Sequence, residues 1–221
     1  NDALGRLVSV VEDPSGTPAA ITYVYDAADR LTDVQQNGRN RHFGYDTLGR
    51  LGVATNPESG TVSYTYDGNG NLTKKTDARG AVTQYAYDAL NRMTMKWYTV
   101  PGGVAATDSV TYCYDGTVAG TGDGTCQAPA TAIGYGWNHL TEVRTQTATP
   151  PQTETSRTTY LNFDALGRVA GSQQSGYNAF GYEYNLAGGL TKMTYPSGCI
   201  VSYSYTGAGR VQEVRQGMDG S

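Results

Sequence analysis

The sequence is poor in charge and in the side chains that most often perform catalysis. Charged residues make up 16% of the 221 residues, the formal net charge is −4, and there are two histidines and three cysteines. This balance argues against a nucleic-acid partner, because proteins that bind the phosphate backbone usually carry a basic stripe. It also argues against disorder, because disordered chains are richer in charge and poorer in aromatic residues.

The sequence also lacks a continuous apolar run of about 20 residues, which a membrane-spanning helix requires. It has no secretory signal peptide, and it does not begin with Met. Residues 1–7 already belong to a motif that recurs downstream. We therefore interpret the chain as a piece of a longer protein, with no membrane span in this piece.

Glycine and tyrosine are present in excess. The chain contains 29 glycines and 18 tyrosines, against three phenylalanines and two tryptophans. Glycine averages about 7% of residues in ordinary proteins, and it is unfavourable inside helices. The composition therefore predicts a chain rich in β-structure and turns.

A motif with the pattern aromatic-x-Tyr-Asp-x-x-Gly-Arg-Leu recurs along the chain. Asp26, Asp46, Asp67 and Asp88 follow one another at steps of 20 or 21 residues. Self-similarity at such a period is typical of proteins that stack small structural units. The residues that define the repeat are Tyr23, Tyr25, Asp26, Arg30, Tyr45, Asp46, Gly49, Arg50, Tyr64, Tyr66, Asp67, Gly70, Tyr85, Tyr87, Asp88, Arg92, Asp164, Gly167, Arg168, Tyr182, Tyr184, Tyr203, Tyr205 and Arg210.

About ten such units of about 21 residues fill residues 1–221. They include a truncated copy at 112–115 and a cryptic copy at 135–140. The stretch 145–155 is polar and contains prolines, so we expect an exposed loop there. Insertions lengthen the repeat near residues 97–108, 116–131 and 141–159.

Each unit is predicted to form a β-hairpin. Ile21, Tyr23 and Tyr25 alternate with other residues at a period of two, which indicates a strand. Three residues after the Asp position, all nine copies have Gly, Asn or Asp, the residues that best tolerate a positive φ. About twenty strands exceed what an open twisted sheet holds without curling. We therefore predict an all-β fold, in which antiparallel hairpins form a curled or spiralling strip.

The repeated Tyr-Asp-x-x-Gly-Arg-Leu motif resembles the RHS, or YD, repeat over nearly the whole chain. That family includes bacterial polymorphic toxins, toxin-complex shell proteins and animal teneurins. The resemblance implies a β-shell wall, the rest of a parent RHS chain and an enclosed polypeptide as partners, and a secreted or cell-surface location. The core-associated segment and the self-cleavage site of the bacterial members are absent from this sequence, so neither activity is inferred. The leading hypothesis is a non-enzymatic structural segment.

The repeated side chains have structural interpretations. An Asp before a tight turn accepts backbone N–H bonds, and we expect the arginines to bridge to carboxylates or carbonyls of adjacent hairpins. The tyrosines are expected to form a ladder of cross-strand neighbours on one sheet face. An alternative is that some of them line an extracellular surface that binds glycans or proteins. A further alternative is self-association through open sheet edges.

Catalytic, cofactor and metal sites are not predicted. His42 and His139 have no neighbouring nucleophile signature, and zinc sites prefer clustered His and Cys ligands. Residues 67–71 begin like a calcium-binding loop but lack its later Gly and Glu. A calcium site formed by Asp115 and Asp123 remains open as a weak alternative.

The three cysteines lie at positions 113, 126 and 199. A disulfide between Cys113 and Cys126 would close the intervening insertion and contribute about 3 kcal/mol in the chain-entropy model. The spacing leaves open whether the two are oxidised or free. Cys199 is in phase with the apolar face of a strand, so we expect it to be a buried thiol.

Overall fold

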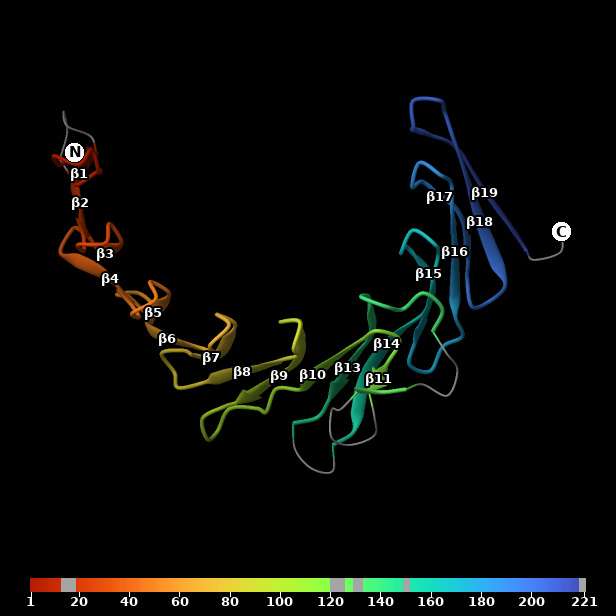
Figure 1. Cartoon of the computed structure of the whole chain (residues 1–221), viewed down its shortest axis with the longest axis horizontal. Coiled ribbons are helices and arrows are strands. Elements are labelled where there is room, and N and C mark those ends of the chain that lie inside the picture. The colour runs from red at the N-terminus through yellow and green to blue at the C-terminus, as the bar shows by residue number, and fades with distance from the viewer. Residues whose placement is uncertain (13–18, 120–125, 129–132, 149–151, 219–221) are drawn as a thin grey trace. The chain divides into compact units, whose positions relative to one another are not determined.

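The computed structural model describes residues 1–12, 19–119, 126–128, 133–148 and 152–218. Every regular element in this part of the chain is a β-strand (Figure 1), which confirms the all-β prediction. No helix in the described residues is long and apolar enough to cross a membrane. The chain divides into two compact units, the first formed by residues 1–91 and 98–105, and the second by 92–97 and 106–221.

The first unit is an antiparallel meander in which each strand from β1 to β7 pairs with the next one along the chain. Figure 1 shows these hairpins following one another in chain order. The strands are β1 (Ser9–Glu12), β2 (Ala19–Tyr25), β3 (Leu31–Gln36), β4 (Arg39–Tyr45), β5 (Leu51–Asn56), β6 (Gly60–Tyr66), β7 (Leu72–Thr76) and β8 (Val82–Tyr87).

The second unit has the same antiparallel order, with a two-stranded insertion between β10 and β13. Its first strand, β9 (Met93–Thr99), belongs to this unit up to residue 97 and pairs with β10. The other strands are β10 (Ser109–Tyr114), β11 (Val118–Ala119), β12 (Cys126–Gln127), β13 (Leu140–Gln146), β14 (Glu154–Phe163), β15 (Val169–Gln174), β16 (Phe180–Tyr184), β17 (Leu190–Thr194), β18 (Cys199–Tyr205) and β19 (Val211–Met218).

The turn after each Tyr-Asp pair has the backbone that its residues predict. All nine residues at the third position after the Asp have a positive φ, from 61° at Asp29 to 92° at Gly70. Glycine occupies most of these positions because it has no Cβ to clash there, and Asn and Asp tolerate the same region best among the other residues. The uniform choice of residue therefore reflects a backbone requirement.

A β-bulge follows seven of these nine turns, and the sequence pattern did not indicate it. In the hairpin of β6 and β7, Tyr66 pairs with Leu72 but Thr65 pairs with Lys74, so Thr73 is the extra residue. The Thr73 hydroxyl donates a hydrogen bond of 3.1 Å to the carbonyl of Thr65. Bulges bend a strand and increase its local twist. The same register shift occurs in the hairpins β2–β3, β4–β5, β10–β13, β14–β15, β16–β17 and β18–β19.

The copies expected at 112–115 and 135–140 prove to be two halves of one repeat. Asp115 accepts the N–H of Asn138 at 2.6 Å and donates its own N–H to the carbonyl of His139. Tyr114 pairs with Leu140, as the Tyr and Leu of an uninterrupted repeat do. The chain leaves the repeat after Asp115 and re-enters it before Asn138. The insertion therefore interrupts only the turn, and the ladder of the hairpin stays intact.

The loop expected at 145–155 is shorter than predicted. Strand β13 continues to Gln146 and β14 begins at Glu154, and Thr145 pairs with Ser156 across them. The threonines of this polar stretch pair across the ladder: the hydroxyls of Thr145 and Thr155 lie 2.8 Å apart. Polar β-branched residues favour strands as well as loops.

The apolar core is thin in both units. Ala54 is the one fully buried apolar side chain described in the first unit, and Cys113 and Phe163 are those described in the second. Most other strand residues are half-buried. Cys199 is half-buried as well, so the prediction of a buried thiol is wrong. Apart from the short β11–β12 pair, the strands of each unit lie in one sheet layer, and such a layer has no partner to bury its face.

Candidate functional site

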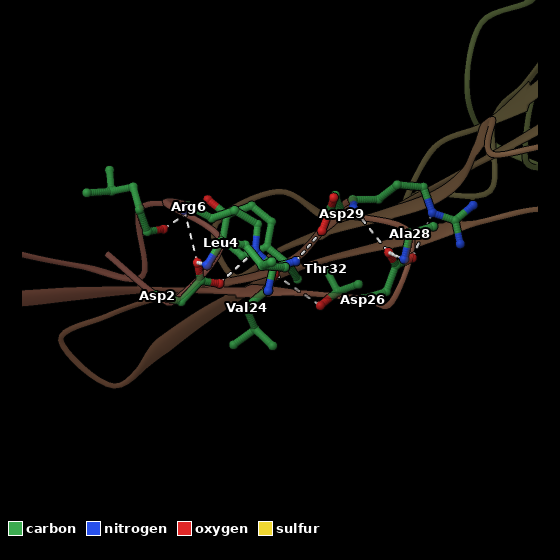
Figure 2. A network of polar contacts seen from close by, with 11 residues as sticks. Asp2, Leu4, Arg6, Val24, Asp26, Ala28, Asp29 and Thr32 are labelled. Carbon is green, nitrogen blue, oxygen red and sulfur yellow. Dashed lines mark hydrogen bonds and ion pairs between the residues drawn. The ribbon is translucent and has the colours of Figure 1, made fainter.

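The most regular constellation in the molecule joins each repeat to the next. Asp46 begins it: its Oδ1 accepts the N–H groups of Leu48 and Arg50 at 2.9 Å, and its Oδ2 accepts the Arg50 Nε at 2.7 Å. Figure 2 shows the same arrangement at Asp2 and Asp26. Hydrogen bonds from the backbone N–H and guanidinium of Arg50 lower the pKa of Asp46 below its ordinary value.

The arginine then reaches forward into the following repeat. Arg50 donates from Nη1 to the carbonyl of Asp67 at 2.9 Å, while its Nε stays on Asp46. Arg168 does the same toward the carbonyl of Asn185 at 2.8 Å. Both bonds agree with the expectation that these arginines bridge to carboxylates or carbonyls of adjacent hairpins. Each guanidinium is thereby fixed at both ends.

The second tyrosine of the following repeat completes the contact. The ring of Tyr66 lies under the Arg50 guanidinium, 4.7 Å from its carbon, and its hydroxyl donates to the carbonyl of Leu51 at 2.9 Å. We call this set, Asp and Arg of one repeat with the second Tyr of the next, the repeat clasp. The other tyrosines that donate to the preceding repeat are Tyr25, Tyr45, Tyr87, Tyr114, Tyr184 and Tyr205.

The clasp explains why tyrosine rather than phenylalanine dominates the composition. A cation above an aromatic ring contributes about 0.5–1 kcal/mol at exposed sites, and the hydroxyl adds one hydrogen bond to a backbone carbonyl of the preceding repeat. Five of the second-slot rings therefore face guanidinium groups, in place of the ladder of aromatic neighbours that the sequence suggested. Guanidinium groups lie over the rings of Tyr25, Tyr45, Tyr66, Tyr114 and Tyr184.

Two repeats build the clasp from other residues. Asn71 replaces the arginine and donates to Asp67 Oδ2 at 2.9 Å and to Asn91 Oδ1 at 2.8 Å. His139 replaces it in the split repeat and stacks on Phe163 with ring centroids 4.5 Å apart. Because amide and stacking contacts serve in the same place, and Gly189 fills it in another repeat without any side chain, the slot does not require a charge.

The first-slot tyrosines have a different environment. Tyr23, Tyr64, Tyr85 and Tyr203 are half-buried, and the hydroxyl of Tyr182 lies 3.0 Å from Ser172 Oγ.

The remaining predicted residues take places consistent with a structural role. Asp88 accepts the N–H of Leu90 at 2.9 Å, and the Asp115 carboxylate accepts hydrogen bonds from Nη1 and Nη2 of Arg92. Asp123, the second residue of the calcium alternative, lies outside the described residues, as does the glycine-rich stretch 120–124. Among the described residues, no group of three or more His, Cys, Asp or Glu side chains is placed to hold a metal ion.

Cys113 and Cys126 are joined by a disulfide in the structure, with their Cα atoms 5.5 Å apart. The bond ties β12 of the insertion to β10. The Thr141 hydroxyl, at the bulge of the same hairpin, donates to the carbonyl of Cys113 at 3.1 Å. The insertion of the split repeat is therefore fixed at its base to the strand it interrupts.

Sequence analysis missed a polar cluster beside this insertion. Glu142 is 1% exposed and accepts a hydrogen bond from Thr159 at 2.9 Å. It lies at a cavity of about 360 Å³, which Arg157 and Gln174 also line. An isolated Glu in a strand gives no sequence signal of burial, because its cover comes from an insertion whose path the repeat pattern does not determine.

The comparisons with known proteins agree with this geometry. The RHS repeat family model matches residues 2–36, 25–62, 45–82 and 66–105. No curated protein matches the chain.

Two solved structures share the fold at low sequence identity. The crystal structure of TcdB2-TccC3 matches 99% of this chain and 12% of its own chain, with a TM-score of 0.70 and 13% identity. The crystal structure of TcdB2-TccC3-Cdc42 matches 97% of this chain and 14% of its own, with a TM-score of 0.50 and 13% identity. At this identity the likeness shows the fold alone, and this chain spans about an eighth of the TcdB2-TccC3 chain. Residues 2–105 match the RHS repeat model, and the same hairpin and clasp recur beyond them, so the chain is similar to RHS-repeat proteins.

Proposed function

We propose that this chain is a non-enzymatic segment of the wall of an RHS-type β-shell, which encloses a polypeptide. The observation that carries the proposal is the clasp. The Asp, Arg and Tyr side chains that recur in the sequence are used to hold each hairpin to the next. Side chains engaged in this way are unavailable for proton transfer or nucleophilic attack.

The single layer supports the same role. A wall must be continuous along the strip and thin across it, and here hairpin after hairpin pairs edge to edge with few fully buried apolar side chains. Repeat architectures gain stability from neighbour contacts of this kind. The similarity of this fold to part of the TcdB2-TccC3 chain also supports the proposal. The proposal extends to the rest of a parent RHS chain as the main partner, and to a secreted or cell-surface location.

Protease protection tests the wall function in the natural protein that contains this segment. We expect the enclosed polypeptide to be cut slowly in the wild type, and faster when Arg50→Ala and Tyr66→Ala break one clasp. Tyr64→Phe, on the same strand β6, is the matched control and should leave protection unchanged. Equal cleavage rates in wild type and clasp variant, with the variant folded, would contradict the proposal.

A second candidate function, glycan binding, is favoured by two exposed aromatic side chains of the insertion. Trp137 is 80% exposed and Tyr135 is 69% exposed, and large flat aromatic surfaces of this kind commonly contact ligands. A glycan array probed with wild type and Trp137→Ala tests it, and Tyr177→Ala, at a tyrosine that is 66% exposed outside the insertion, is the control. Loss of a bound glycan in Trp137→Ala alone supports the candidate, and the absence of any bound glycan rejects it.

A further inference from the structure

A row of residues outside the repeat clasp crosses four strands of the second unit. Cys113, Glu142, Thr159 and Gln173 lie side by side on β10, β13, β14 and β15, because each is paired with the next in the ladder. Cys113 follows Tyr112 in its strand, and successive side chains of a strand point to opposite faces. The row therefore lies on the face of the sheet opposite to Tyr112.

The insertion of the split repeat and this row enclose a cavity between them. The disulfide joins Cys126 of β12 to Cys113, and β12 pairs with β11, which contains Val118. Val118 and Ile133, one from each side of the insertion, line a cavity of about 360 Å³ together with Glu142. The cavity therefore lies between the sheet and the insertion, within the second unit.

A buried acid lines one end of the cavity. Glu142 is 1% exposed, and its Oε2 accepts a hydrogen bond from the Thr159 hydroxyl at 2.9 Å. Burying a carboxylate costs free energy unless charged or hydrogen-bonding groups surround it. Its two oxygens offer about four acceptor positions, and a hydrogen bond from a cation is about twice as strong as one from a neutral donor. This end of the cavity therefore suits a positively charged donor.

A basic side chain lines the cavity as well, nearer to solvent. Arg157 lies diagonally across the β13–β14 ladder from Glu142, because Glu142 pairs with Thr159, and such diagonal neighbours have Cα atoms about 7–8 Å apart. The Arg157 Nε lies 3.4 Å from Glu154 Oε1, which also accepts the Ser175 hydroxyl at 2.7 Å. This contact anchors the guanidinium through Nε, and the fork of its two terminal nitrogens matches a carboxylate.

The rest of the lining combines apolar and amide side chains. Val118, Ile133 and Leu161 line the cavity alongside Gln173 and Gln174. Cavities of about 300–1,000 Å³ with apolar walls and a few converging polar groups are typical of small-molecule sites. The cavity therefore offers an acid, a base and a small apolar surface to one ligand.

We propose that this cavity binds a small zwitterion, namely a free α-amino acid with an apolar side chain. The ammonium group donates to the Glu142 carboxylate, the ligand carboxylate accepts from the Arg157 guanidinium, and the side chain packs on Val118, Ile133 and Leu161. A ligand with a single charge complements only one of the two charged side chains, and an inorganic ion has no apolar part. The site is independent of the wall function, because it uses neither the clasp nor an enclosed polypeptide.

Isothermal titration calorimetry on the whole 221-residue protein tests the proposal, with L-leucine as the probe. We expect a dissociation constant of about 1 mM or lower. N-acetyl-L-leucine lacks the ammonium charge, and L-leucine amide lacks the carboxylate. Each analogue should bind about tenfold more weakly than leucine, or weaker still, because each loses a hydrogen bond between charged groups.

Two variants assign the charged contacts to their residues. Glu142→Gln keeps an acceptor for the Thr159 hydroxyl and should weaken leucine binding about tenfold, as should Arg157→Ala. Arg157→Ala should leave the weaker binding of leucine amide unchanged, because that ligand has no carboxylate to lose. Arg215→Ala is the matched control: its side chain is 76% exposed on β19, and leucine binding should not change.

The proposal is overturned if leucine fails to bind at about 10 mM, or if either analogue binds as tightly as leucine. It is also overturned if Arg157→Ala weakens leucine and leucine amide equally, or if Arg215→Ala weakens leucine binding as much as Arg157→Ala does. If Glu142→Gln does not fold, as judged by circular dichroism, the comparison of leucine with N-acetyl-L-leucine decides the ammonium contact. Protease protection tests the wall function separately, so the two proposals fail independently.

Discussion

At the scale of single residues, one carboxylate organises most repeats, and Asn185 and Thr206 replace it in two. Asp46 closes its turn with Oδ1 and orients Arg50 with Oδ2, so one side chain links the turn to the next repeat. This much could be predicted from the sequence, since an Asp before a tight turn is a standard turn former. The hydroxyl bond from Tyr66 to Leu51 could not, because it depends on how two neighbouring repeats pack, which the residue types of one repeat do not indicate.

Removing one clasp hydroxyl should cost measurable stability. We expect Tyr66→Phe to lower the free energy of unfolding by about 1 kcal/mol, the usual net contribution of such a hydrogen bond. Urea unfolding followed by fluorescence measures the change. Tyr64→Phe is the control, because the Tyr64 hydroxyl makes no hydrogen bond in the described residues. Equal losses in both variants would show that the hydroxyl contributes nothing specific.

The aspartates should make the protein sensitive to acid. Hydrogen bonds from Arg50, Arg30 and Arg168 lower the pKa of Asp46, Asp26 and Asp164 below the ordinary value of 3.8. A carboxyl whose pKa is lower in the folded state stabilises it above the unfolded-state pKa, and this stabilisation is lost as the pH falls through the folded-state pKa. The urea midpoint should therefore stay level near neutral pH and fall below about pH 4.

Asp46→Asn supplies the control for this titration. Asn still accepts the backbone N–H bonds but does not titrate, so the variant should be less stable near neutral pH and should lose less on acidification. A midpoint that rises toward pH 3, or an equal loss in both proteins, would remove the aspartates from the explanation.

At the scale of elements, the hairpin is predictable and its details are not. Alternating residues around Tyr64 and the positive φ of Gly70 follow directly from local pattern and residue type. The extra residue Thr73 does not, because strand pairing is a property of two segments, and a single sequence shows only their separate periods. The prediction of two separate copies at 112–115 and 135–140 was wrong for the same reason. Asp115 and Asn138 belong to one turn, although 22 residues separate them.

The disulfide gives the insertion a testable constraint. In unreduced, denatured protein we expect one free thiol, Cys199, and three after reduction. Reduction should loosen the insertion and destabilise the second unit by about 3 kcal/mol, as closing a loop of this length implies. A Cys113→Ser and Cys126→Ser double variant should match the reduced protein. Three thiols before reduction would mean that the pair is not oxidised in solution.

At the scale of the whole molecule, the repeat is the unit that can be added or removed. Each hairpin contacts its neighbours through strand pairing and the clasp, so stability is close to a sum of local terms. Removal of residues 46–66 joins Tyr45 to Asp67 and deletes one complete 21-residue period. The new junction reproduces the Tyr-Asp sequence, the turn and the clasp of the repeats on either side.

We therefore expect the 46–66 deletion to keep a β-sheet circular dichroism spectrum and a cooperative unfolding transition. Deletion of residues 46–65, one residue fewer, leaves Tyr66 as an extra residue before Asp67 and shifts the strand by one. A shift of one residue exchanges the two faces of a strand, so this variant should lose cooperativity and aggregate. If the two deletions behave alike, the 21-residue period is not the structural unit, and register between neighbouring hairpins does not control folding.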